Sequence, residues 1–185
     1  MHNRLLFATT LLCLLPSVTH AQIHARSNTG RARMELSLDH GFGFSTEGEY
    51  IEVGMDLRVY APEGVGAILR TGVATQLMTI AYVADAGVAY RFDLFATDRV
   101  GLQIGLATGV SVGYGPFDRG EAPALGGFAM AHLDLRTRGM FFGIGVTTHA
   151  LRVFGEEERN SFGDPRSTPV LSATPVLRIG GEWGL

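Results

Sequence analysis

The chain has 185 residues, with 18 acidic side chains against 15 basic ones and a formal net charge of −3. No lysine occurs and no basic patch stands out, so nucleic acid is not an expected partner. The single cysteine, Cys13, lies in a segment expected to be removed, so neither a disulfide framework nor thiol chemistry is expected in the folded domain.

The first 21 residues have the three-part pattern of a secretory signal peptide. Arg4 precedes an apolar run from Leu5 to Leu15, and small residues lead up to Ala21. The run is too short for a transmembrane helix, which needs about 20 apolar residues. We expect cleavage between Ala21 and Gln22. The chain then divides into a signal peptide (1–21), a short N-terminal periplasmic segment (22–33) and one domain (34–185).

From residue 34 onward, apolar residues alternate with polar or small ones, as in strands with one apolar face. The clearest case is Ile51, Val53, Met55, Leu57 and Val59. Eight strands are predicted, and the third is weakly separated from the fourth because residues 77–82 carry no strong turn signal. The predicted strands are 34–45, 50–60, 66–77, 83–95, 100–112, 125–136, 140–152 and 169–185.

The predicted connections differ in length between the two ends of the strands. The second, fourth and sixth are short, at 61–65, 96–99 and 137–139, whereas 113–124 and 154–168 are longer and rich in Gly and Pro. Tight periplasmic turns and longer external loops are typical of outer-membrane barrels. This pattern predicts an all-β, closed, antiparallel up-and-down barrel of eight strands, with both termini on the periplasmic side.

Alternation alone does not say which face is outside. A transmembrane barrel has its apolar face toward lipid, whereas a soluble ligand-binding barrel of the lipocalin type has the reverse. The polar face here is rich in Gly, Ala and Ser, which fit the crowded interior of a narrow barrel. This composition, the connection lengths and the last strand favour the membrane.

If the polar face points inward, it brings many charged side chains into the lumen. We expect them to form ion pairs that close it, because buried ions are tolerated when paired. The excess of acids leaves open a narrow path for cations or other small solutes. The predicted lumen residues are Glu35, Asp39, Glu52, Asp56, Arg58, Arg70, Asp85, Arg91, Asp93, Asp134, Arg136, Arg178 and Glu182.

Two residues fit this pattern poorly. His40 falls on the lipid-facing parity in the first strand, so either a bulge shifts the register after Asp39 or the assignment there is wrong. Pro175 has no N–H to donate to a ladder. We therefore expect Pro175 at the outer rim of the barrel, with residues 176–185 spanning the membrane.

The C-terminal residues carry a recognisable pattern. Arg178, Gly180, Trp183 and Leu185 resemble, in order, the C-terminal assembly signal of outer-membrane barrels, although phenylalanine is usual at the last position. The domain thus resembles the small eight-stranded barrels of the outer membrane protein A and X type. The resemblance implies an integral protein of the bacterial outer membrane, contacts with lipids and lipopolysaccharide, and insertion by the barrel-assembly machinery.

The sequence offers few candidates for catalysis or metal binding. His132, Asp134 and His149 share the lumen parity, but only Ser111 and Ser172 are remotely eligible as nucleophiles, so no enzyme is expected; a lipid hydrolase or acyltransferase is the less favoured alternative. No metal spacing, cofactor motif or phosphate-binding loop occurs. The loop acids Glu156, Glu157 and Glu158 could bind divalent cations bridging lipopolysaccharide, but a solvated loop is favoured. We expect a structural or surface-interaction role.

Overall fold

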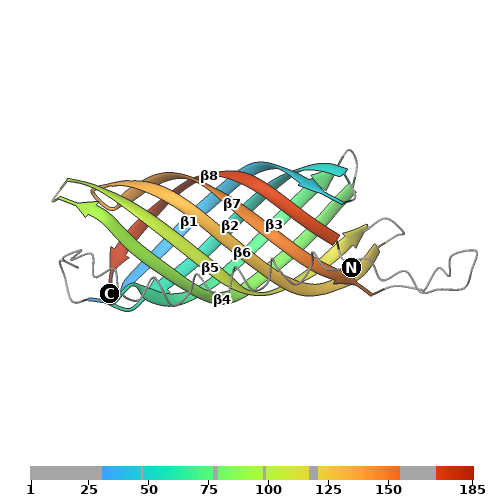
Figure 1. Ribbon diagram of the computed structural model, residues 1–185, viewed down its shortest axis with the longest axis horizontal. Helices are drawn as coiled ribbons and strands as arrows, with labels where there is room; N and C mark the ends of the chain where they lie inside the picture. Colours follow the sequence, from blue (N-terminus) through green and yellow to red (C-terminus); the bar gives the residue numbers. More distant parts are fainter. Residues whose placement is uncertain (1–30, 47, 77–78, 98, 117–120, 155–169) are drawn as a thin grey trace, which may run out of the picture.

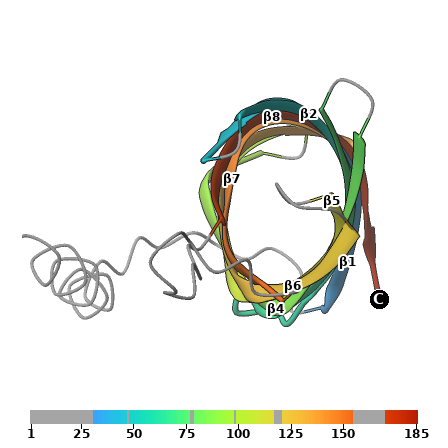
Figure 2. The same ribbon diagram turned by 90° about the vertical axis from the view of Figure 1, so that its right-hand side faces the viewer.

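Eight antiparallel strands close into a single barrel in the order of the sequence (Figure 1; Figure 2). The structure, a computed structural model, describes residues 31–46, 48–76, 79–97, 99–116, 121–154 and 170–185. The strands are β1 (Arg33–Ser45), β2 (Gly48–Tyr60), β3 (Val65–Gln76), β4 (Thr79–Ala96), β5 (Val100–Pro116), β6 (Glu121–Thr137), β7 (Met140–Val153) and β8 (Val170–Gly184).

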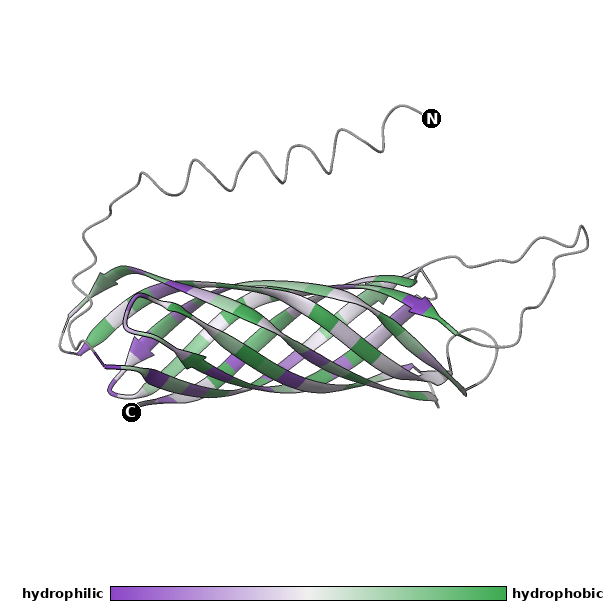
Figure 3. Cartoon of the chain, turned by 90° about the horizontal axis from the view of Figure 1, so that it is seen from below, coloured by the Kyte–Doolittle hydropathy of each residue, from purple (hydrophilic) through white to green (hydrophobic). Residues whose placement is uncertain are grey.

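Successive side chains of each strand alternate between the interior and the exterior of the barrel. Along β1, Glu35, Ser37 and Asp39 are buried, while the residues between them are exposed. The same alternation of hydrophobic and hydrophilic residues runs along the other strands in Figure 3. The exposed face is apolar: Leu177 is 65% exposed, Leu69 61% and Ile144 60%. Apolar residues therefore lie mostly outside and charged residues mostly inside, the opposite of the arrangement in a lipocalin-type barrel.

The turns at the end of the barrel where β1 begins and β8 ends are tight. The β6–β7 connection is Arg138-Gly139, with φ angles of 45° and 84°. A two-residue turn with positive φ at both central residues has a backbone twist that matches the twist of the two strands of the hairpin. At the β2–β3 connection, the amide of Ala61 donates to the carbonyl of Val65 at 2.8 Å. These turns fix the register of the strands that they join.

All eight predicted strands are present, and several are longer than predicted. The main correction concerns 113–124, predicted as a long loop: β5 runs to Pro116 and β6 begins at Glu121, and their pairing continues to Pro116↔Glu121. A ladder that satisfies backbone hydrogen bonds thus extends through residues rich in Gly and Pro. β4 likewise begins at Thr79, ahead of the predicted 83. The region 155–169 lies outside the described residues, and so do the signal peptide and the cleavage site at Ala21 and Gln22.

His40 does lie on the outer face, and no bulge displaces it. The β1–β2 register is continuous from Arg33 to Ser45, with His40 opposite Val53. The irregularity of the register lies elsewhere, between Asp93 and Phe95 of β4. A histidine therefore stands exposed among apolar side chains in the middle of β1.

Pro175 is not at the rim, contrary to the expectation. It lies within β8 and pairs with Val146 of β7. On its other side the β1–β8 pairing stops at Gly41 and resumes at Phe44. The carbonyl oxygen of Pro175 points toward β1, where it contacts the position that a Gly41 side chain would occupy. The N–H and C=O of a strand residue point to the same side, so the nitrogen of Pro175 also faces β1. Because proline has no N–H, the carbonyl of Phe42, which lies opposite Pro175, receives no ladder hydrogen bond from β8.

Among the residues that the structure describes, no helix is long and apolar enough to cross a bilayer. Among the described residues, the interior contains two apolar clusters, the smaller of which is Ala124, Leu151 and Val170. The larger one is contributed by inward residues of β2 to β6. It consists of Tyr60, Ile68, Ala89, Ala107, Phe128 and Met130.

Candidate functional site: the charged lumen

The charged residues predicted for the lumen all lie on the inward face. Most are nearly inaccessible, with Asp56 and Arg58 0% exposed. Asp93, Arg136 and Glu182 lie closest to the end where β1 begins and β8 ends, and their side chains are 17%, 18% and 9% exposed. The residues fall into a central cluster and a terminal cluster.

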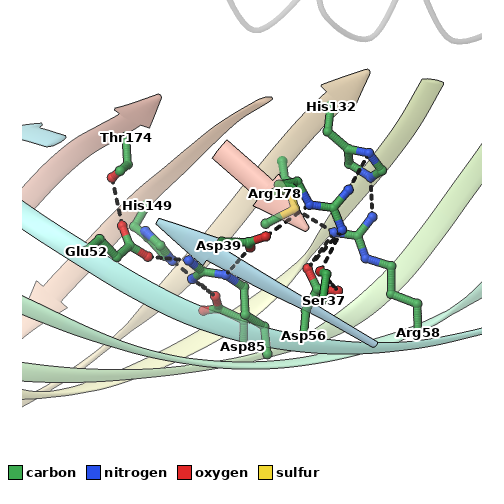
Figure 4. A network of polar contacts seen from close by, with 12 residues as sticks. Ser37, Asp39, Glu52, Asp56, Arg58, Asp85, His132, His149, Thr174 and Arg178 are labelled. Carbon is green, nitrogen blue, oxygen red and sulfur yellow. Dashed lines mark hydrogen bonds and ion pairs between the residues drawn. The ribbon is translucent and has the colours of Figure 1, made fainter. Parts of the chain in front are cut away.

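Arg178 of β8 is the hub of the central cluster (Figure 4). Its Nε donates to Asp39 Oδ1 at 3.0 Å and its Nη1 to Asp134 Oδ2 at 2.8 Å. Its Nη2 lies 2.9 Å from Ser37 Oγ and 3.3 Å from Asp56 Oδ2. One guanidinium thus joins β8 to β1, β2 and β6. The rigid fork of donors on arginine makes such multiple bonding possible.

Arg58 and His132 extend the cluster toward β6. Arg58 donates to Asp56 Oδ2 at 2.8 Å and also to Nε2 of His132. The other ring nitrogen, Nδ1, lies 2.6 Å from Nη1 of Arg178. Nδ1 also lies 2.8 Å from Asp134 Oδ2. The His132 ring therefore lies between the guanidinium groups of Arg58 and Arg178 and the carboxylate of Asp134.

Arg70 of β3 lies close to three carboxylates. It pairs with Glu52, lies 3.1 Å from Asp85 Oδ2 and 3.6 Å from Asp39 Oδ2. The second oxygen of Glu52 accepts from Thr174 Oγ1 at 2.7 Å. The central cluster holds more carboxylates than guanidinium groups: Asp39, Glu52, Asp56, Asp85 and Asp134 against Arg58, Arg70 and Arg178.

The terminal cluster converges on Glu182 of β8. Arg33 approaches its Oε1 at 2.8 Å, Arg136 pairs with its Oε2, and Arg91 lies 3.6 Å from Oε2. Arg91 also pairs with Glu35 at 3.1 Å. Arg33 was assigned to the segment before the barrel, but β1 begins at this residue. The two charged residues of β8 thus hold side chains from β1, β2, β4 and β6.

Inward glycines provide the space that the long polar side chains occupy. A Cβ on Gly54 would lie 2.7 Å from Nη2 of Arg70. A Cβ on Gly105 would overlap the His132 ring, and one on Gly143 would overlap the Asp134 carboxylate. Each large side chain lies over a glycine of an adjacent strand, so glycine is required there for space. A narrow barrel could not otherwise hold so many charged groups.

Asp85 and His149 form the arrangement nearest to a catalytic pair. Nε2 of His149 lies 3.2 Å from Asp85 Oδ2. Ser172 faces His149 across the β7–β8 ladder and Ser111 faces Asp85 across β4–β5. Within the described ranges no hydrogen bond joins either serine to His149, and no group of three or more His, Cys, Asp or Glu could hold a metal ion. The hydroxyl–imidazole contact that activates a nucleophile is missing from this part of the chain.

Several residues of the network were not predicted from the sequence. Ser37, Gln103 and Thr174 bond to network charges, and Tyr50 bonds to Thr174 at 2.6 Å. They share the inward parity of the charged residues, which is the signal that could have found them. The pairing of each inward glycine with a long side chain depends on the register between neighbouring strands. It cannot be read from the sequence of one strand alone.

The fold and this lumen define the class: a small, closed, eight-stranded β-barrel of the outer-membrane type, filled by ion pairs. No protein-family model matches the chain, and no match is found among curated proteins.

Solved structures of low sequence identity share the fold. Neisserial surface protein A (NspA) aligns with a TM-score of 0.55 at 8% identity, covering 84% of this chain and 98% of that one. The N-terminal β-barrel domain of Pseudomonas aeruginosa OprF aligns with a TM-score of 0.51 at 11% identity, covering 84% and 100%. The recognition of a small outer-membrane type barrel is therefore confirmed at the level of fold.

Proposed function

We propose that this chain is an integral protein of the bacterial outer membrane with a closed lumen and a structural or surface-interaction role. Two observations support membrane insertion: the apolar outer face and the shared fold of outer-membrane barrels. In hydrocarbon every backbone polar group needs a partner within the protein, which a closed barrel supplies. Lipids and lipopolysaccharide would cover the outer face, the barrel-assembly machinery would insert the chain, and both termini would be periplasmic.

The observation that carries the closed lumen is the central cluster. Arg178, with five polar partners from β1, β2 and β6, crosses the interior at the level of Arg58 and His132. Eight strands leave an interior that side chains can fill. A barrel without passage would act through its surfaces, which favours the structural or interaction role.

Conductance in a planar bilayer tests this proposal. The wild-type barrel is expected to be silent, and Arg178→Ala to give a leak, because the substitution empties the middle of the lumen and leaves carboxylates unpaired. Arg152→Ala, which changes an exposed arginine outside the lumen, is the matched control and should stay silent. Sustained openings of the wild type would overturn the closed-lumen proposal.

A narrow cation path is the second candidate, favoured by the excess of carboxylates over guanidinium groups in the central cluster. It would give wild-type openings that select cations over anions. The same recordings therefore separate the two functions, with ion selectivity as the additional readout.

A further inference from the structure

The mouth of the lumen at the end where β1 begins and β8 ends is basic. A hollow of about 220 Å³ lies there between the β4–β5 and β6–β7 turns. Of the residues that the structure describes, four arginines and one carboxylate line it: Arg33, Arg99, Arg136, Arg138 and Asp93. Unlike the central cluster, this hollow has more guanidinium groups than acids.

The positive charge of the hollow is only partly neutralised. Arg33 and Arg136 pair with Glu182, and Arg136 lies 3.7 Å from Asp93. Arg99 and Arg138 are exposed on the two turns, and no ion pair joins either of them to another described residue. The charge of these two arginines is therefore available to a ligand.

The lining selects for phosphate chemistry. Guanidinium groups bind phosphate oxygens through paired, charge-assisted hydrogen bonds, and arginines from two turns can reach different oxygens of one group. We propose that this mouth binds a phosphate group, carried by a phospholipid headgroup or by a soluble phosphate. The site goes beyond the proposed function, and only its lipid source rests on membrane insertion.

The surroundings are compatible with a lipid source. Phe95, Val100 and Met140, which are 49%, 37% and 49% exposed, lie on the outer face beside the same two turns. A lipid could thus place its phosphate in the hollow and its chains against these side chains. Trp183, the single tryptophan, is 49% exposed, and its β8 strand runs beside the β6–β7 turn, with the Glu182 amide bonded to the Gly139 carbonyl.

Because Trp183 lies beside the hollow, its fluorescence can report whether a lipid binds there. The full chain is reconstituted in phosphatidylcholine vesicles containing a minor share of chain-brominated phosphatidylglycerol, and quenching of tryptophan fluorescence is measured. Quenching above that expected from the bulk share is predicted for the wild type. Arg99→Gln with Arg138→Asn should reduce it to the bulk level; asparagine tolerates the positive φ of residue 138. Arg152→Gln, an exposed arginine at the opposite end, should leave quenching unchanged.

To test a soluble phosphate, inorganic phosphate is titrated into the full chain in non-ionic detergent, and binding is measured by calorimetry. Each arginine substitution should weaken binding about tenfold, the effect of losing one hydrogen bond to a charged group. Loss of both signals in the double variant supports a lipid-borne phosphate, and loss of the calorimetric signal alone, without lipid enrichment, supports a soluble one. Absence of both signals in the wild type, or their persistence in the double variant, would overturn the proposal.

Discussion

At the scale of single residues, the lumen depends on a few guanidinium groups, each bonded to several strands. Arg178 is 2% exposed and Arg58 0% exposed, so their partners have little access to water. An unpaired carboxylate in such a place costs far more than a surface ion pair contributes. The contributions to stability should therefore be very unequal among the arginines of the chain.

We expect Arg178→Ala to lower the free energy of unfolding by about 3–5 kcal/mol, because it leaves Asp39 and Asp134 without their shared guanidinium. Denaturant unfolding in detergent micelles measures this difference. Arg152→Ala, at an exposed position, should change the value by no more than about 0.5 kcal/mol. Similar values for the two variants would show that water replaces the lost guanidinium.

The inward glycines make a second prediction at this scale. Gly143→Ala is expected to destabilise the barrel by about 1–3 kcal/mol, because the new methyl group displaces the Asp134 carboxylate and approaches the Leu133 carbonyl oxygen at 2.7 Å. Gly184→Ala is the control, since nothing lies within 4 Å of its Cβ position. Both are compared by thermal unfolding. Equal midpoints would contradict the requirement for space at Gly143.

At the scale of elements, β8 closes the barrel and has an imperfect ladder with β1. Arg178 and Glu182 reach across the lumen from this strand, while Pro175 interrupts its backbone pairing. At this β1–β8 seam, side-chain contacts inside the lumen join the two strands, while the backbone hydrogen-bond ladder is interrupted at Phe42. The outer face of this seam also includes His40, which lines a groove of about 830 Å³ together with Phe42 and Pro175.

Pro175→Ala should restore the missing ladder donor. The new amide at residue 175 is expected to exchange its hydrogen as slowly as that of Ala173, whose pairing with Phe44 is intact. Hydrogen exchange followed by NMR is the appropriate measurement, because loss of the rigid proline offsets part of any gain in unfolding free energy. Fast exchange at residue 175 would show that the seam stays open for reasons other than the missing N–H.

The end of β8 carries the resemblance to an assembly signal. Trp183 and Leu185 point outward and are 49% and 62% exposed. Trp183→Ala with Leu185 removed is expected to leave the chain unassembled in the periplasm, as judged by membrane fractionation and by heat-dependent gel migration. Phe95→Ala, which removes an equally exposed aromatic side chain near the end of β4, should assemble normally. Normal assembly of the β8 variant would remove the basis for the resemblance.

At the scale of the whole molecule, the barrel is inverted relative to a soluble domain. Its charges are inside and its large apolar side chains outside, so water on the outer face would oppose the folded state. Placing the barrel in hydrocarbon reverses the sign of that effect and makes the outer face stabilising. The stability of the barrel should therefore depend on the depth at which a charge is added.

Val53→Arg, in the middle of β2 on the outer face, is expected to lower the free energy of unfolding in lipid vesicles by about 2–4 kcal/mol. Glu49→Arg, on the same face near the end of β2, should cost at most about 1 kcal/mol, because an arginine there can reach the interface. Equal effects would argue against a membrane around β2. Gly54, the inward neighbour of Val53, is unsuitable as a control because Arg70 occupies its side-chain space.

The sequence by itself determined the periodicity, and with it the number of strands and the face on which each side chain lies. The period of two is a local property of extended chain, so even His40, which fitted poorly, lay where its parity placed it. Turn chemistry was also local, as Arg138-Gly139 shows. Strand ends and loop lengths were less accessible, because pairing with a neighbour extended β5 and β6 into a segment that local signals marked as loop.

Only the tertiary structure decided the partners. Parity alone places Arg178 and Glu182 in the lumen. Barrel closure, strand tilt and register decide that Arg178 pairs with Asp39 and Asp134. They likewise decide that Glu182 pairs with Arg33, Arg91 and Arg136. The gap at Pro175 and the basic mouth likewise arise between segments far apart in the chain. The physical reason is that parity follows from each strand alone, whereas a contact across the lumen requires the position of every strand at once.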